Sequence, residues 1–307
     1  MPSDERTGLD TGSLLLVRAA RLTGVLEALL STAGTPGEVA AETDLSVADA
    51  DRLVGALADL GLFEEVDGAY EPTNRALGML AKRDVRSIGA IPHELDRLEE
   101  LVGLPETLET GVPPERPAEW EVNALGAHHA SDEATVRARV TAAVRAAPDA
   151  DSVVDVCGGS GVHAREFAAR GLDATLVESP SAVDALGRVH GDRVRLHAGT
   201  PAALEESFGL AFLGGVLSGM DPAEARATLA VTADLLSPGG ALVAVDALGD
   251  GSAASVAAEA RGLATGHGGA HDPDEVRDWL AEAGLADVRI ESVPGTEDTA
   301  VIGVVDD

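Results

Sequence analysis

Apolar residues recur at helical spacing through the first sixty positions of the chain. Residues 13–30 carry a stripe broad enough to pack against another helix, formed by Leu15, Leu22, Val25, Leu26, Leu29 and Leu30. A second helix is expected after Thr35, where Pro36 and Glu38 complete a capping box. Ser46 is the expected cap of a third helix, which ends at Gly61. The pattern predicts a small helical unit at the start of the chain.

Alternation of apolar and polar residues replaces helical spacing after Gly61. Asp67-Gly68 lies between two short alternating segments and is a strong signal for a tight hairpin. Helices followed by a hairpin predict a winged-helix domain in residues 1–88. Its expected recognition helix, residues 47–60, carries three aspartates against Arg52 and would present negative charge to DNA. We therefore expect this domain to serve in dimerisation and in shaping a substrate site, without nucleic acid as a partner.

The pattern changes twice more along the chain. Residues 89–148 are expected to form a mostly helical connector that contributes to an acceptor pocket. In the segment 149–307, short apolar runs alternate with helix-like segments, the runs being residues 152–156, 173–179, 193–199, 209–217 and 240–248. Residues 287–295 and 299–307 are expected to close the chain as a hairpin. This order predicts an α/β fold with an open, mostly parallel sheet and an antiparallel edge.

Composition narrows the function classes. The chain has 307 residues, with 53 acidic and 22 basic residues and a formal net charge of -31. Such a surface repels phosphate backbones, and acidity spread along the whole chain suggests a salt-rich cytoplasm. Cys157 is the only cysteine, so no intramolecular disulfide is expected. The sequence has no apolar run of about 18 residues, so we expect neither secretion nor a membrane partner.

The glycine-rich turn in residues 152–168, "SVVDVCGGSGVHAREFA", follows the first strand of this fold. Gly158, Gly159 and Gly161 would let the backbone approach a ligand closely, and Glu178 ends the next strand, where a carboxylate binds ribose hydroxyls. The ligand could be a dinucleotide or S-adenosylmethionine. Asp155 precedes the loop, where it would repel a pyrophosphate but suit an ammonium and a sulfonium group, directly or through the loop backbone. These residues favour S-adenosylmethionine as the cofactor.

The chain resembles the S-adenosylmethionine-dependent O-methyltransferases of the plant caffeate and acetylserotonin type over nearly its full length. "VVDVCGGSG" is similar to the family's V-D-V-G-G-G-[ST]-G, and "LVESPSAV" to its strand that ends in D-L-P. "LSPGGALVAVDAL" resembles its L-x-P-G-G strand, and "DPDEVRDWLAEAGLADVRI" its R-T-x-E-E-W segment. The resemblance implies a Rossmann-like methyltransferase domain in residues 149–307, a small-molecule acceptor, a dimerising winged helix and Glu178 as the ribose acid.

The chain departs from the family at three positions. Ser218 stands where the plant members have a catalytic histidine, and a neutral serine is no general base without activation. Thr200 stands where the family has an acid that holds adenine, so its hydroxyl is the expected contact. Cys157 replaces a glycine of the loop and is expected to be a packed residue. The alternative function is therefore a non-catalytic S-adenosylmethionine-binding regulator or scaffold.

Histidine is the residue type whose pKa best suits a base near neutral pH. We place His267 first, because its glycine-rich loop precedes the final helix, in a region that resembles the family's acceptor-side segment. His128, His129 and His271 are the other histidines expected to be able to face an acceptor. No ligand spacing predicts a metal site. The apolar stripe of residues 15–30 further predicts a homodimer through the N-terminal domain.

Overall fold

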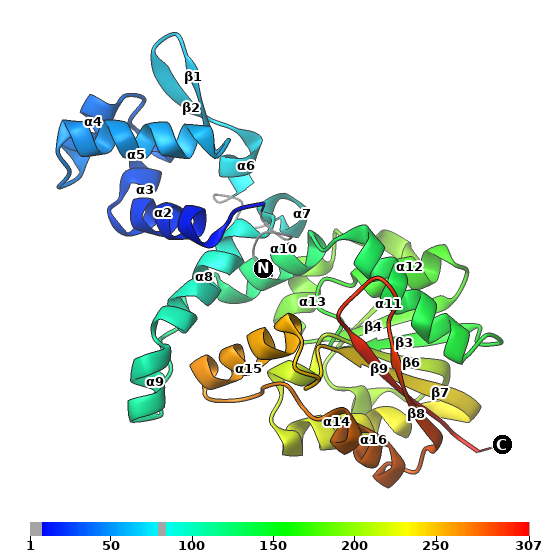
Figure 1. Ribbon diagram of the computed structural model, residues 1–307. Coiled ribbons are helices and arrows are strands. Elements are labelled where there is room, and N and C mark those ends of the chain that lie inside the picture. Colours follow the sequence, from blue (N-terminus) through cyan, green and yellow to red (C-terminus); the bar gives the residue numbers. More distant parts are fainter. Residues whose placement is uncertain (1–7, 79–83, 307) are drawn as a thin grey trace.

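The computed structural model describes residues 8–78 and 84–306. An N-terminal unit of short helices and one hairpin lies at one end of the molecule (Figure 1). Its elements are α2 (Thr11–Leu22), α3 (Val25–Ser31), α4 (Pro36–Glu42), α5 (Val47–Asp59), β1 (Phe63–Val66), β2 (Ala69–Pro72), α6 (Asn74–Leu77) and α7 (Val85–Ile88). This unit has its own hydrophobic core, which includes residues of α8.

Local sequence signals account for the boundaries of this unit. Thr35 and Glu38 form the predicted capping box, and the Ser46 side chain caps α5. Asp67 and Gly68 both have positive φ angles, of 52° and 85°, as the tight turn between β1 and β2 requires. The predicted stripe of residues 15–30 is divided between α2 and α3, because Gly24 adopts a φ of 78° and ends the first helical path.

Four helices connect this unit to the sheet domain. They are α8 (Ile91–Val102), α9 (Leu104–Thr110), α10 (Trp120–His129) and α11 (Glu133–Ala146). Helices α8 and α9 extend away from the N-terminal unit, and α15 (Ala253–Thr265) packs beside both (Figure 1). Within the described residues, no helix has the length and apolar character needed to cross a membrane.

A seven-stranded sheet forms the rest of the chain, and the predicted α/β fold is confirmed. The strands are β3 (Ser152–Val156), β4 (Asp173–Glu178), β5 (Arg195–Ala198), β6 (Phe208–Gly214), β7 (Leu236–Asp246), β8 (Ala286–Ser292) and β9 (Thr299–Val304). Their order is β5-β4-β3-β6-β7-β9-β8. The first five pair in parallel, and β9 is antiparallel to both of its neighbours, so β9 is the antiparallel strand and β8 forms the edge beside it.

Helices cover both faces of this sheet (Figure 1). One face carries α11, α12 (Val162–Ala169) and α13 (Pro180–Leu186), and the other carries α14 (Pro222–Ala233) and α16 (Pro273–Glu282). Successive strand residues point to opposite faces, so Val153 packs in one core cluster and Val154 in the other. Burial on both faces explains why the central strands are nearly continuous apolar runs. The carboxyl ends of the parallel strands all lie on one side of the sheet, here called the sheet edge, and polar residues gather there.

Candidate cofactor and acceptor site

The glycine-rich loop joins β3 to α12 in a tight turn. Cys157, Gly159 and Gly161 have φ angles of 53°, 56° and 71°, so three of the five residues between these elements are left-handed. Such angles favour glycine, which explains why the related family has glycine where this chain has Cys157. Cys157 packs against a buried cluster, and burial raises the pKa of its thiol to about 12. This thiol therefore stays protonated near neutral pH and is not a nucleophile.

Glu178 closes one side of the loop from the end of β4. Its Oε1 accepts a hydrogen bond from the Gly159 amide at 2.7 Å, and its Oε2 accepts one from the Ser179 amide at 2.9 Å. Burial raises the pKa of the Glu178 carboxyl, and these two amides offset part of the shift. The carboxylate is half-buried at the loop and has lone pairs left that can accept further hydrogen bonds.

Asp155 lies beneath the loop. It is fully buried, and its Oδ2 accepts a hydrogen bond from the Ala164 amide at 3.0 Å. A Cβ at Gly158 would lie 2.4 Å from the Asp155 carboxyl, so glycine is needed there for steric reasons. Burial raises the pKa of Asp155 to about 8. Direct contact with a cofactor does not fit this placement, because the carboxyl lies beneath Gly158 and its hydrogen bond goes to the first turn of α12.

Thr200 reaches the same edge of the sheet. The amide of Gly199 donates to the Glu178 carbonyl at 2.9 Å, which brings the end of β5 beside the end of β4. Thr200 is exposed there. The structure therefore brings together Gly158, Gly159, Gly161, Glu178 and Thr200, with Asp155 supporting them from below.

His128 contacts this loop from the connector, a contact that the sequence did not indicate. The Ser160 amide donates to Nδ1 of His128 at 3.0 Å. A Cβ at Gly159 would lie 2.6 Å from the same nitrogen. Helix α10 therefore contacts the loop through the His128 side chain, and the connector covers part of the loop.

A cavity of about 650 Å³ opens between the connector and the sheet edge. The connector wall consists of His93, Ala124, Ala127, His128, Ser131, Thr135 and Arg139. The opposite wall consists of Gly214, Gly215, Ser218, Asp246, Ala247, Ala253, Ala254, Ala257, Arg261, Gly295, Thr296, Glu297 and Asp298. His128 belongs both to this cavity and to the contact with the glycine-rich loop, so the two sites adjoin.

Asp246 ends β7 at the base of the cavity and is 3% exposed. Its Oδ2 accepts a hydrogen bond from the Ser218 amide at 3.0 Å, and its Oδ1 accepts one from the Ala247 amide at 2.8 Å. Ser218, at the position that resembles the family's histidine, thus orients a carboxylate through its backbone. Sequence reasoning missed Asp246, although an acid that ends a buried strand is a detectable signal.

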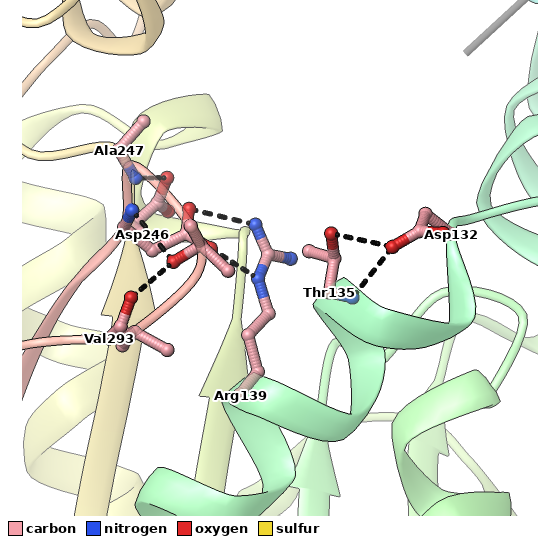
Figure 2. A network of polar contacts seen from close by, with 8 residues as sticks. Asp132, Thr135, Arg139, Asp246, Ala247 and Val293 are labelled. Carbon is pink, nitrogen blue, oxygen red and sulfur yellow. Dashed lines mark hydrogen bonds and ion pairs between the residues drawn. The ribbon is translucent and has the colours of Figure 1, made fainter. Parts of the chain in front are cut away.

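Arg139 links the connector to the other wall of the cavity. Its guanidinium makes two hydrogen bonds to Asp298, at 2.7 and 2.9 Å. Figure 2 shows the side chain reaching from α11 toward the end of β7 and the loop that follows Val293. Burial lowers the pKa of Arg139, but its hydrogen bonds to Asp298 and the charges of Asp298 and Asp246 raise it overall. This bidentate pair holds the loop between β8 and β9 in place as a cavity wall.

Of the four histidines expected to be able to face an acceptor, His128 lines the cavity, whereas His267, His271 and His129 do not. His267 is exposed and outside the residues that line the cavity, and its Nδ1 lies 3.2 Å from the Gly219 carbonyl. His271 is buried, with Nε2 2.9 Å from the Leu217 carbonyl. Burial is the main cause that lowers the pKa of His129. Of the described histidines, His93 and His128 line the cavity. The geometry therefore does not favour His267 as the base.

Replacing His267 by alanine is expected to leave methyl transfer unchanged, because the imidazole lies outside the cavity. Steady-state rates with a labelled methyl donor check this prediction. A loss of about a hundredfold, at unchanged cofactor affinity, would instead identify His267 as the base.

Among residues 8–78 and 84–306, no group of three or more His, Cys, Asp or Glu side chains could hold a metal ion. The glycine-rich loop and the polar cavity adjoin each other at the carboxyl ends of the parallel strands.

Comparison with known proteins identifies the class. The family described as a methyltransferase domain matches residues 127–290, more than half of the chain. The chain belongs to this methyltransferase family. No curated protein matches the sequence.

Solved structures share the fold over almost the whole chain. PigF in complex with SAH is 17% identical, with a TM-score of 0.71 and coverage of 95% of both chains. Human N-acetylserotonin methyltransferase in complex with SAM is 18% identical, with a TM-score of 0.67 and coverage of 96% of this chain and 94% of that one. NcsB1, an O-methyltransferase from neocarzinostatin biosynthesis, is 22% identical, with a TM-score of 0.64 and coverage of 98% of both.

Proposed function

We propose that the protein transfers the methyl group of S-adenosylmethionine to an oxygen of a small-molecule acceptor. The observation that carries the proposal is the contact of Glu178 and the glycine-rich loop at one edge of a sheet, directly beside a cavity of about 650 Å³. The backbone of Gly158, Gly159 and Gly161 would hold the methionine part, Glu178 the ribose and Thr200 the adenine edge. The cofactor supplies an activated methyl group when it is bound.

The neighbouring structures support this choice of cofactor. PigF is bound to SAH, and the human acetylserotonin enzyme is bound to SAM. NcsB1 is bound to SAM and to 2-hydroxy-5-methyl naphthoic acid, a small molecule with a hydroxyl group. The position of the cavity beside the loop suits in-line displacement, in which positioning of the two reactants supplies much of the rate.

Calorimetric titration with S-adenosylhomocysteine tests the proposal, and saturable binding is expected. Glu178→Ala should weaken this binding about tenfold to a hundredfold, because hydrogen bonds between the ribose and a charged group would be lost. Absence of binding to the unmodified protein at high salt would reject the proposed cofactor. Binding without transfer from a labelled donor to phenolic, indolic, quinone or polyhydroxylated acceptors would favour the non-catalytic regulator or scaffold, since Ser218 replaces the family's histidine.

We further propose that residues 1–88 form a winged-helix dimerisation domain and that the protein works in a salt-rich cytoplasm. The exposed Leu15 and Leu22 of α2 and the net charge of -31 support these proposals. Light scattering at high salt should return twice the chain mass of 31.2 kDa. The mass of a single chain would contradict the dimer.

A further inference from the structure

The side chains that line the cavity are either small or polar. Within the described part of the chain, no Leu, Ile, Val, Met, Phe, Tyr or Trp lines it. Its apolar surface comes from alanines and glycines, and its polar surface from charged, hydroxyl and imidazole groups. Pockets for flat, drug-like molecules are lined mainly by large hydrophobic and aromatic side chains, together with few polar groups. This cavity has the opposite composition.

The aromatic residues of the chain are used elsewhere. Aromatic residues make up 2% of the sequence, and Phe63, Phe167, Phe208 and Phe212 are all fully buried. An acceptor ring would therefore find no Phe, Tyr or Trp to stack on among the described lining residues. A flat apolar acceptor would also cover charged groups without replacing their water, which costs free energy at each group.

Polar groups of complementary kind lie on the cavity walls. Asp246 and Glu297 are hydrogen-bond acceptors on one wall, and Ser131 on the other offers a hydroxyl. Asp246 already accepts two amide hydrogen bonds, but a carboxylate has about four lone-pair sites, so it has acceptor capacity left. A ligand that satisfies several such groups must both donate and accept at several points. Hydroxyl groups distributed around a small ring do so.

We propose that the acceptor is a polyhydroxylated small molecule of the sugar or cyclitol class, and that Asp246 receives the proton of its reacting hydroxyl. This inference rests on the proposed methyl transfer. The strand order places Asp246, at the end of β7, two strands from the glycine-rich loop that follows β3, with β6 between them. Asp246 therefore lies on the side of the sheet edge where the acceptor cavity opens.

The proposed reaction needs only the acceptor hydroxyl, the methyl donor and the carboxylate of Asp246. The bond between the acceptor oxygen and the methyl carbon forms as the bond between that carbon and sulfur breaks, and the hydroxyl proton moves to an Oδ of Asp246. The sulfonium becomes a neutral thioether, the carboxylate becomes a neutral acid, and Asp246 then loses the proton to water. Of the other acids of the cavity, Asp298 pairs with Arg139, and Glu297 is exposed on the loop between β8 and β9, whereas Asp246 is buried at a strand end.

The test compares two groups of acceptors at the same high salt concentration. Glucose and myo-inositol represent the polyhydroxylated class, and catechol, caffeate and N-acetylserotonin the flat aromatic class. We expect labelled methyl transfer to the first group. We also expect the first group, at millimolar concentration, to raise the melting temperature of the complex with S-adenosylhomocysteine. Faster transfer to the aromatic compounds would overturn the proposed acceptor class. It would also be overturned if the polyhydroxylated compounds were neither methylated nor able to raise the melting temperature.

Asp246→Asn tests the role of the carboxylate. Asparagine keeps the shape and one acceptor oxygen, which can serve the Ser218 amide or the Ala247 amide but not both. We expect the turnover number to fall about a hundredfold or more, with unchanged affinity for S-adenosylhomocysteine. Asp234→Asn, at an exposed carboxylate after α14, is the matched control and should be active. Unchanged turnover in Asp246→Asn would overturn its role as base. If the unmodified protein does not bind S-adenosylhomocysteine, the proposed function itself is rejected.

Discussion

Replacing Gly158 by alanine is expected to weaken cofactor binding strongly. The new Cβ would lie 2.4 Å from Cγ and Oδ2 of Asp155, and this carboxyl is fully buried and cannot move into solvent. The loop must shift instead. Overpacking of this kind costs roughly 1–3 kcal/mol, which corresponds to a loss of affinity of about fivefold to 150-fold if all of it appears in binding. Calorimetry with S-adenosylhomocysteine measures the effect.

Two controls isolate the steric cause. Gly55→Ala, in α5, meets no atom within 4 Å and should leave binding unchanged while stabilising the helix slightly. The cost of Gly158→Ala should also be smaller in an Asp155→Ala background, where the clashing carboxyl is absent. An equal cost in both backgrounds would show that the contact with Asp155 is not the reason for this glycine.

Asp155→Asn is expected to stabilise the protein increasingly as the pH rises from about 4 to 8. The folded pKa of Asp155 is raised from 3.8 to about 8 by burial, so the folded state holds a proton that the unfolded state has released. Stability is then lost with rising pH, by at most about 1.4 kcal/mol per pH unit, and asparagine avoids this loss. Asparagine also keeps an acceptor for the Ala164 amide.

Urea unfolding at pH 5 and pH 8, at one high salt concentration, measures the difference. The free energy of unfolding of Asp155→Asn relative to the unmodified protein should be larger at pH 8. Asp173→Asn replaces an exposed carboxylate at the start of β4 and should change stability little at either pH. A pH-independent effect of Asp155→Asn would mean that this carboxyl is ionised in the folded protein at both pH values.

The helix ends and the hairpin turn could be predicted from the sequence, because each depends on interactions between residues that are close along the chain. The capping box of Thr35 and Glu38, the cap at Ser46 and the turn at Asp67-Gly68 each depend on residues within about three positions. Strand positions followed from apolar runs, because burial on both faces of a parallel sheet requires them. The break at Gly24 was missed, since a glycine is compatible with either a continuous or an interrupted helix.

The candidate site was predictable only in part. Glu178 and the loop glycines lie near in sequence to the elements that place them, so their spacing was informative. His267 was chosen from its place in the sequence, and it is not among the residues that line the cavity. That lining comes from the connector, two strand ends, α15 and the loop between β8 and β9. Asp246 and Ser218 are 28 positions apart, and Arg139 and Asp298 are 159 apart. Spacing carries no information about such pairs.

Sequence alone was sufficient for the class of protein, the succession of strands and helices along the chain and the glycine-rich loop, because these features are recorded in patterns of neighbouring residues. The order of the strands in the sheet was not predicted. The acid that faces the acceptor, the histidine that rests on the loop and the polar character of the cavity depended on tertiary packing. Packing brings together α10, α11 and the carboxyl ends of β6 and β7, and the side chains at their junction are remote from one another along the chain.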